Sequence, residues 1–179
     1  MSELGNVFLI GPMGSGKTAV GRQLARDLEI EFMDSDAEIE RRTGVDITFI
    51  FEKEGEGRFR KREKAIIAEL ARRDNLVLAT GGGAVLDSDN RRLLGANGIV
   101  VYLKTGVKQQ LERTRHTEKR PLLLKKDPAA VLEQLMEVRG PLYEELANIT
   151  VDTGGQRVKS VVDSIKTQLL EHDFAPLKR

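Results

Sequence analysis

The sequence lacks cysteine and tryptophan, and aromatic residues make up only 4% of its 179 positions. Without cysteine, disulfides, thiolate nucleophiles and cysteine-based metal sites are excluded. The few aromatic side chains provide no stacking platform for nucleic-acid bases. The two histidines, His116 and His172, are too few and too far apart to suggest a metal site. These absences direct attention to chemistry carried out by carboxylates, lysine, arginine and the backbone.

An excess of charge of one sign is also absent, because 29 Lys and Arg stand against 28 Asp and Glu. A net charge of +1 gives no global reason to expect a nucleic-acid or membrane partner. The N-terminus leads into only four consecutive apolar residues, Val7 to Ile10, too few for a secretory signal or a membrane span. We therefore expect a single domain over residues 1–179, cytoplasmic and monomeric.

The most informative segment that is present runs from Gly11 to Thr18 and reads Gly-Pro-Met-Gly-Ser-Gly-Lys-Thr. It fits the phosphate-binding pattern G-x-x-x-x-G-K-[ST] at every fixed position. Its glycines allow backbone N–H groups to close around phosphate oxygens, Lys17 supplies positive charge, and the Thr18 hydroxyl is suited to Mg²⁺. A glycine-rich helix entry without a ligand is the alternative. The segment predicts binding of a nucleoside triphosphate.

Short β-prone runs alternate with stretches of helical periodicity along the whole chain. Such alternation predicts a three-layer α/β/α sandwich with a parallel sheet, whose ligands bind at the carboxyl ends of the strands. The expected strands are residues 6–10, 31–33, 76–79, 99–103 and 149–151, and the clearest later helices are 58–73, 128–136 with Asp127 as N-cap, and 158–170.

Two carboxylates, Asp34 and Asp36, follow the second expected strand. Residues two apart in an extended segment point to the same side, so both carboxylates would face the ligand cleft. One can hold a magnesium-bound water while the other orients and deprotonates an acceptor hydroxyl. An aspartate at a strand end is also a common cap for the next helix, and this alternative stays open.

Glycines and arginines supply the remaining polar features. Gly81 to Gly83 follow an expected strand and permit close approach to a small ligand, although a simple turn also explains them. Arg60, Arg120 and Arg139 carry guanidinium groups that can clamp carboxylate or phosphate. Within residues 113–126, six Lys or Arg accompany one Glu, a local net charge of +5. This predicts a lid over phosphates, with a solvated basic loop as the alternative.

Taken together, these residues resemble the shikimate kinase family over about residues 7–162. Six motifs occur in the family's order: G-x-M-G-x-G-K-[ST], F-x-D-[ST]-D, F-R-x-x-E, G-G-G, R-P-L-L and R-x-P-L-Y. The resemblance implies a P-loop fold like that of nucleoside monophosphate kinases, with a five-stranded parallel sheet in the order 2-3-1-4-5. It also implies an acceptor-binding region at about residues 34–62 and a lid at about 113–126.

The activity implied by this resemblance is transfer of phosphate from ATP to the 3-hydroxyl of shikimate, yielding shikimate 3-phosphate and ADP. This reaction belongs to the chorismate pathway of aromatic amino-acid biosynthesis. Asp36 would bind the acceptor hydroxyls and act as base, with Lys17 and Arg120 assisting catalysis. Arg60 and Arg139 would grip the shikimate carboxylate. Gly81, Gly82 and Gly83 would contact the ring hydroxyls.

One Mg²⁺ would accompany ATP, bound directly by Thr18 and through water by Asp34, again by resemblance. Arg113 and Gln156 would lie near the adenine. The family often has an arginine in the loop that carries Gln156, and here that loop is Gly154-Gly155-Gln156-Arg157. Ala19 replaces a commoner Ser or Thr. The implied nucleotide-binding residues are Gly14, Ser15, Gly16, Lys17, Thr18, Ala19, Arg113, Arg120 and Gln156.

Two other functions compete with this one. A kinase for another small hydroxy acid, such as gluconate, would keep the phosphate loop but would not need Arg60 and Arg139 around one carboxylate. A nucleotide-binding switch or regulatory module would not need Asp36, and the sequence has no N-K-x-D guanine-reading segment. We expect the apolar residues Ile47, Phe49, Ile50 and Phe51 to form the core of the acceptor region rather than to contact ligand.

Overall fold

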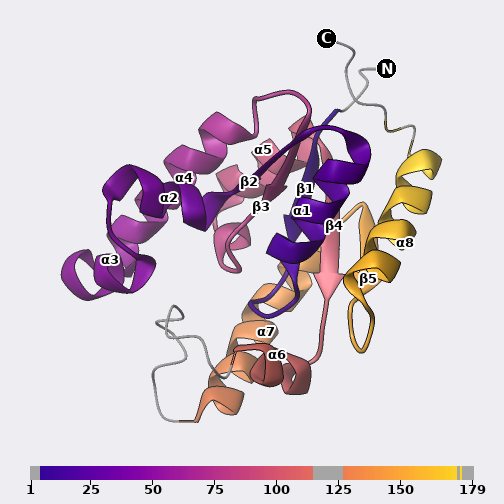
Figure 1. Ribbon diagram of the computed structural model, residues 1–179. Helices are drawn as coiled ribbons and strands as arrows, with labels where there is room; N and C mark the ends of the chain where they lie inside the picture. Colours follow the sequence, from indigo (N-terminus) through magenta and orange to yellow (C-terminus); the bar gives the residue numbers. More distant parts are fainter. Residues whose placement is uncertain (1–4, 115–126, 173, 175–179) are drawn as a thin grey trace.

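A parallel β-sheet forms the centre of the computed structural model (Figure 1). In residues 5–114, 127–172 and 174, which the structure describes, five strands pair in the order β2-β3-β1-β4-β5. Val7 of the central strand lies in register with Val77 on one side and Ile99 on the other. The expected strand order is confirmed. The strands are β1 (Val7–Ile10), β2 (Glu31–Asp34), β3 (Leu76–Ala79), β4 (Ile99–Lys104) and β5 (Ile149–Asp152).

Helices cover both faces of the sheet and make it the middle of three layers (Figure 1). They are α1 (Lys17–Leu28), α2 (Ser35–Thr43), α3 (Ile47–Glu54), α4 (Glu56–Leu70), α5 (Ser88–Asn97), α6 (Val107–Thr114), α7 (Pro128–Leu146) and α8 (Val158–Glu171), with a short 3₁₀ turn, η1 (Ala84–Leu86). None of the helices within the described ranges is long and apolar enough to cross a membrane.

Alternation of side chains along the strands divides the core between the two faces of the sheet. Val7 and Leu9 of β1 pack with residues of α1 and α8, such as Leu24. Phe8 and Ile10 pack on the opposite face with residues of α2, α3, α4, α5 and α7. Every residue of β1 is apolar and buried, as is typical of a central strand with helices on both faces of the sheet. This packing fixes the carboxyl end of β1, where the phosphate loop begins.

Helix α7 begins as predicted but continues beyond the expected end. Asp127 caps it by accepting a hydrogen bond from the Ala130 backbone N–H at 3.2 Å, and Pro128 occupies the first turn. The helix then runs through Pro141 to Leu146, whereas its end was expected at Met136. An internal proline removes a backbone hydrogen bond, and burial of later residues such as Tyr143 offsets that loss. Arg139 consequently lies on a helix.

The apolar residues of α3 only partly form the expected core of the acceptor region. Ile50 is buried and Phe51 packs against the main cluster, as expected. Phe49 is 46% exposed, so the expectation for this residue was wrong. Ile50 follows Phe49 by one residue, which on a helix turns the side chain by about 100°. Only one of the two can therefore face the neighbouring helices α2 and α4.

Candidate active site

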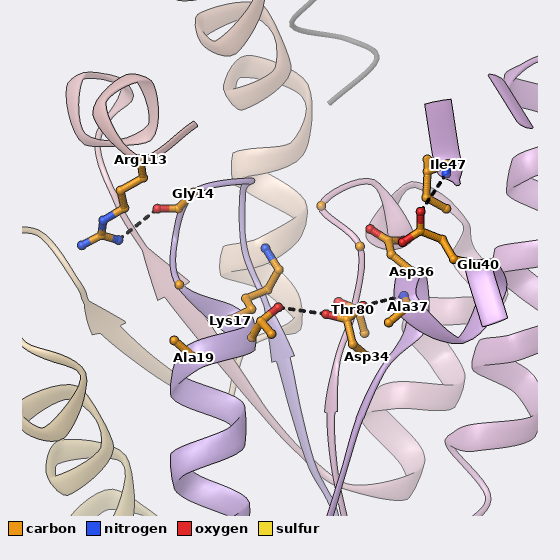
Figure 2. Close-up of a pocket in the computed structure, with 14 residues that line it drawn as sticks. Gly14, Lys17, Ala19, Asp34, Asp36, Ala37, Glu40, Ile47, Thr80 and Arg113 are labelled. Carbon is orange, nitrogen blue, oxygen red and sulfur yellow. Dashed lines mark hydrogen bonds between the residues drawn. The ribbon is translucent and has the colours of Figure 1, made fainter. Parts of the chain in front are cut away.

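A cavity of about 560 Å³ lies at the carboxyl ends of β1, β2 and β3 (Figure 2). Asp36, Glu40 and Ile47 lie together on one side of it, and Gly14 and Arg113 lie on the other. A volume of this size accommodates small-molecule ligands. The lining residues are Gly14, Gly16, Lys17, Thr18, Ala19, Asp34, Asp36, Ala37, Glu40, Ile47, Thr80, Gly81, Gly82 and Arg113.

The phosphate loop joins β1 to α1, so the N-terminus of a twelve-residue helix faces the cavity. Gly16, the N-cap, has φ 90°, a backbone conformation that favours glycine. The Lys17 ammonium donates hydrogen bonds to the carbonyl oxygens of Gly11 at 2.7 Å and Pro12 at 2.9 Å. The helix N-terminus and this ammonium place positive charge at one end of the cavity, which suits a phosphate chain.

Asp34 connects the phosphate loop to α2. Its Oδ2 accepts a hydrogen bond from the Thr18 hydroxyl at 2.9 Å, and its Oδ1 caps α2 by accepting one from the Ala37 N–H at 3.0 Å (Figure 2). Helix capping, the alternative considered from the sequence, is therefore correct for Asp34. The same carboxylate also lies beside Thr18, so capping and proximity to the phosphate loop occur together.

The pair of Thr18 and Asp34 offers oxygen ligands of the type that Mg²⁺ prefers. Among the described residues, no group of three or more His, Cys, Asp or Glu is placed to hold a metal ion by itself. A magnesium ion usually keeps several waters and binds through one or two protein groups together with substrate phosphates. The residues present fit an ion that arrives with a nucleotide.

Asp36 reaches the cavity by a different geometry from the one expected. Strand β2 ends at Asp34, and Asp36 lies in the first turn of α2. The argument from an extended segment was therefore wrong, although both carboxylates do line the cavity. Asp36 is directed towards the turn after β3, because a Cβ added to Gly81 would lie 2.8 Å from its Oδ1.

Gly81, Gly82 and Gly83 form a turn against which charged groups from three helices pack. A Cβ on Gly81 would lie 2.8 Å from Glu63 Oε2 as well as from Asp36, and one on Gly82 would lie 3.4 Å from Arg139 Nη1. A Cβ on Gly83 would collide with the Arg60 guanidinium. The absence of side chains at all three positions lets two carboxylates and two arginines gather around one backbone turn.

Arg60 and Glu63 form a partly buried ion pair beside this turn. Arg60 Nη1 lies 2.8 Å from Glu63 Oε1, and Nη2 lies 3.2 Å from Glu56 Oε1. Burial acts to lower the pKa of Arg60, but the attraction of Glu63 and Glu56 outweighs it and raises that pKa. Burial also raises the pKa of Glu63, whose side chain is 1% exposed. Arg60 therefore stays charged beside the turn.

Arg139 approaches the turn from α7 and is buried. Burial lowers the pKa of its guanidinium, and the nearby charge of Arg60 acts in the same direction. The buried Glu63 carboxylate lies near both guanidinium groups and offsets part of their mutual repulsion. Two arginines and two carboxylates therefore meet at the glycine turn beside the acceptor end of the cavity.

Arg113, at the end of α6, closes the opposite side of the cavity. Its Nη1 donates to the Gly14 carbonyl oxygen at 2.9 Å, and its Nη2 donates to the Thr153 carbonyl oxygen at 3.1 Å. Gln156 is exposed, donates from Nε2 to the Asp152 carbonyl oxygen at 2.7 Å, and does not line the cavity. Arg113 therefore connects the phosphate loop to the loop after β5.

Comparison with known proteins decides the family. The family model described as shikimate kinase matches residues 13–170. The chain belongs to the shikimate kinase family. A relative named shikimate kinase from Vibrio cholerae serotype O1 is 54% identical over 172 residues, which cover 96% of this chain and 99% of that protein.

Solved structures of this family and of a more distant protein share the fold. A shikimate kinase from Acinetobacter baumannii, in complex with shikimate, has a TM-score of 0.92 and 49% identity, covering 93% of each chain. A gluconokinase from Sinorhizobium meliloti 1021 has a TM-score of 0.63 and 20% identity, covering 97% of this chain and 95% of that one. The second likeness shows the P-loop kinase fold alone.

Most residues that the shikimate kinase motifs single out meet at this cavity. Ser15 is buried behind it and lies 3.4 Å from Lys17 Nζ. Arg60 and Arg139 do not line the cavity itself but pack against its glycine turn, and Gly83 belongs to that turn without lining the cavity. Arg120, with residues 115–126 of the expected lid, lies outside the described residues.

Three residues were given no role at the site from the sequence. Glu63 belongs to the F-R-x-x-E motif, and its spacing of three from Arg60 on one helix predicts the observed ion pair. Tyr143 stands in the R-x-P-L-Y motif, four residues after Arg139 on α7. Ile47 belongs to the core as expected and also lines the cavity, where its backbone N–H donates to Glu40 Oε2 at 3.1 Å.

Proposed function

We propose that this chain transfers the γ-phosphoryl group of ATP to the 3-hydroxyl of shikimate, giving shikimate 3-phosphate and ADP in the chorismate pathway. The observation that carries the proposal is the composition of the two ends of one cavity. Lys17 and the N-terminus of α1 occupy one end, while Asp36 and the glycine turn occupy the other. The site can therefore hold a phosphate donor and a small hydroxylated acceptor side by side.

The acceptor end matches the chemistry of shikimate group by group. Arg60 and Arg139, whose charges are brought together at the glycine turn, would bind the carboxylate. Gly81, Gly82 and Gly83 present backbone groups at close range to the ring hydroxyls. Asp36 would accept a hydrogen bond from the hydroxyl that reacts.

In the phosphoryl transfer step, Asp36 takes the proton of the 3-hydroxyl as the acceptor oxygen bonds to the γ-phosphorus. The bond from that phosphorus to the β–γ bridging oxygen breaks, and ADP leaves with the bridging oxygen. Lys17 neutralises charge that develops on the phosphoryl oxygens, which preorganised positive groups stabilise most in the transition state. Lys17 must exchange its contacts to Gly11 and Pro12 for phosphate oxygens in this role.

Thr18 would bind the Mg²⁺ that accompanies ATP directly, and Asp34 would bind it through water. When bound, the ion neutralises phosphate charge. Gly14, Ser15, Gly16 and Ala19 would surround the phosphates, and Arg113 and Gln156 would lie on the nucleoside side. Arg120 would reach the transferring phosphate from the lid at about residues 113–126. We further propose a monomeric, cytoplasmic enzyme with one Mg²⁺ per subunit.

A coupled ADP-release assay with a panel of hydroxy acids tests the function. Purified protein, MgATP and one acceptor at a time, including shikimate and gluconate, are compared with a reaction that contains no acceptor. We expect shikimate to stimulate ADP release far above that background, with one ADP per shikimate 3-phosphate. The variant Lys17→Ala, measured in parallel, shows whether the ADP arises at this cavity.

Each other outcome of the assay identifies a rival function. Stimulation by gluconate without stimulation by shikimate would indicate a kinase for another hydroxy acid. Slow ADP release that no acceptor changes would indicate a nucleotide-binding module. Either result would refute the proposed acceptor.

A further inference from the structure

The buried hydroxyl of Tyr143 has no part in the proposed mechanism, yet it touches the site. Tyr143 lies on α7, its side chain is fully buried, and its ring stacks on Tyr102 with the ring centroids 5.0 Å apart and 28° between the planes. Packing alone explains the ring, since phenylalanine would fill the same space. The hydroxyl needs a separate explanation, because a buried polar group is costly unless it is hydrogen-bonded.

This hydroxyl donates a hydrogen bond to the Gly82 carbonyl oxygen, in the middle of the glycine turn. The Arg139 guanidinium, one helical turn earlier on α7, lies close enough to Tyr143 for its positive charge to oppose the rise in the pKa of that side chain. Arg139 also lies against Gly82, since a Cβ added to Gly82 would be 3.4 Å from Arg139 Nη1. Tyr143 and Arg139, both on α7, therefore approach the same glycine.

The hydroxyl remains a donor throughout the physiological pH range. Burial raises the pKa of Tyr143 further above its ordinary value of 10.0, against the opposing effect of Arg139. The hydroxyl can therefore keep donating to the Gly82 carbonyl oxygen. Phenylalanine would leave that carbonyl without this donor.

Gly82 is the point where the two halves of the site meet. A Cβ added to it would lie 3.4 Å from Arg139 Nη1, 3.5 Å from the Met13 backbone nitrogen and 3.6 Å from the Gly11 carbonyl oxygen. Gly11 and Met13 belong to the phosphate loop, and Arg139 belongs to the acceptor end. A group that holds Gly82 in place therefore holds the acceptor end at a fixed distance from the phosphate loop.

We propose that Tyr143 is a positioning residue for the phosphoryl acceptor. Its hydroxyl holds the Gly82 carbonyl, and with it the Arg139 guanidinium, at a fixed position relative to the phosphate loop. The proposal rests on the proposed function, since it takes shikimate as the anion that Arg139 binds. Tyr143 itself touches neither substrate nor the reacting atoms. Its effect should fall on the acceptor and on turnover, because misplacement of about 1 Å can slow a reaction by about 10²-fold.

The variant Tyr143→Phe tests this role, with Tyr102→Phe as the matched control. The control removes a hydroxyl from the same pair of stacked rings and leaves the Tyr143 to Gly82 hydrogen bond in place. For Tyr143→Phe we expect kcat/KM for shikimate to fall by about 10- to 100-fold, while the KM for ATP stays within about twofold. For Tyr102→Phe we expect both values to stay within about twofold.

A double-mutant cycle with Arg139→Ala separates positioning from a general loss of stability. If Tyr143 acts through Arg139, Tyr143→Phe should change the KM for shikimate by less than about twofold in the Arg139→Ala background. The lowering of Tm by Tyr143→Phe, measured by thermal unfolding, should be the same in both backgrounds. Equal increases of the KM for ATP and the KM for shikimate would refute the positioning role, as would a lower Tm with unchanged kinetics.

The wild-type protein distinguishes failure of this inference from failure of the proposed function. Shikimate-dependent ADP release by the wild type, together with an unchanged kcat/KM for shikimate in Tyr143→Phe, would refute the positioning role and leave the function intact. A wild type that releases no ADP in response to shikimate would refute both.

Discussion

Asp36 lines the cavity as predicted, but the geometry that brings it there differs from the predicted one. An extended segment would have directed Asp34 and Asp36 to the same side, but the chain turns into α2 after Asp34. Asp34 reaches the cavity as a helix cap, and Asp36 reaches it from the first helical turn. The residue types were predictable because phosphoryl transfer requires them. Their geometry was not, because strand and helix ends are hard to place from sequence.

The variant Asp36→Asn should keep its affinity for MgATP and lose turnover by about 10²-fold or more, since an amide cannot accept the hydroxyl proton. Steady-state kinetics measures the turnover, and titration with MgADP measures nucleotide binding. Glu38→Gln is the control, because Glu38 is on the same helix but pairs with Arg41 and Arg42 rather than lining the cavity. Turnover within about threefold of wild type in Asp36→Asn would exclude Asp36 as the base.

Glu63 and Tyr143 were present in the sequence motifs, but the motifs assign them no chemistry. For Glu63, the spacing from Arg60 predicts an ion pair on one helix face. For Tyr143, the partner Gly82 is 61 residues earlier in the chain. Pairings over such separations depend on how α7 packs on the turn after β3, and local sequence carries no signal for that.

At the scale of secondary structure, the strands and the starts of helices were predictable, whereas the end of α7 was not. Glycine and proline in succession usually mark a helix boundary, yet α7 continues through Gly140 and Pro141. Tertiary packing of Tyr143 against the core overrides this local preference. Arg139 and Tyr143 are aligned one above the other only because the helix is continuous.

Helix α2 is tied to α4 by a network of charges. Glu38, whose side chain is 7% exposed, pairs with Arg41 at 2.6 Å and Arg42 at 2.8 Å, and Arg42 reaches Glu69 of α4 at 2.7 Å. Hydrogen bonds from Arg41 and Arg42 lower the pKa of Glu38 to about 2 from an ordinary value of 4.5. The ionised form of Glu38 therefore stabilises the folded state.

Because the folded-state pKa is depressed, this stabilisation is present above about pH 4.5 and is lost as the pH falls towards 2. Glu38→Gln should lower the free energy of unfolding by about 1 kcal/mol at pH 7, since its partners are largely exposed. Urea unfolding of both proteins at several pH values between 7 and 3 measures the difference. The difference in the free energy of unfolding between the two proteins should become smaller below pH 4.5. A difference that does not change with pH would show that the charge on Glu38 does not cause it.

At the scale of the whole molecule, the parallel sheet follows from the alternation of strands and helices. The order 2-3-1-4-5 came instead from the resemblance to a family, because strand order depends on contacts between distant segments. Val7 and Leu9 are buried on one face of the sheet, and Phe8 and Ile10 on the other, but this burial is compatible with several strand orders. Once that order is set, β1 and β3 are neighbours, and the phosphate loop lies next to the glycine turn.

Binding of MgADP should stabilise the whole fold, because its ligands come from segments on several strands and helices. At about 100 times the dissociation constant, the stabilisation is about 2.7 kcal/mol, or roughly 5 to 10 °C in Tm for a chain of this size. Thermal unfolding at increasing MgADP concentrations measures the effect. Lys17→Ala should reduce it, and a wild-type Tm that does not respond to MgADP at millimolar concentration would contradict the assigned nucleotide site.

The parallel arrangement of the strands has a practical consequence for handling the molecule. Every strand ends at the edge that carries the cavity, while β1 begins and α8 ends at the opposite edge (Figure 1). An anchor to a solid support, or a fluorescent reporter protein, placed next to the start of β1 or the end of α8 would thus be attached at the edge away from the cavity. The mouth of the cavity would stay open to both substrates.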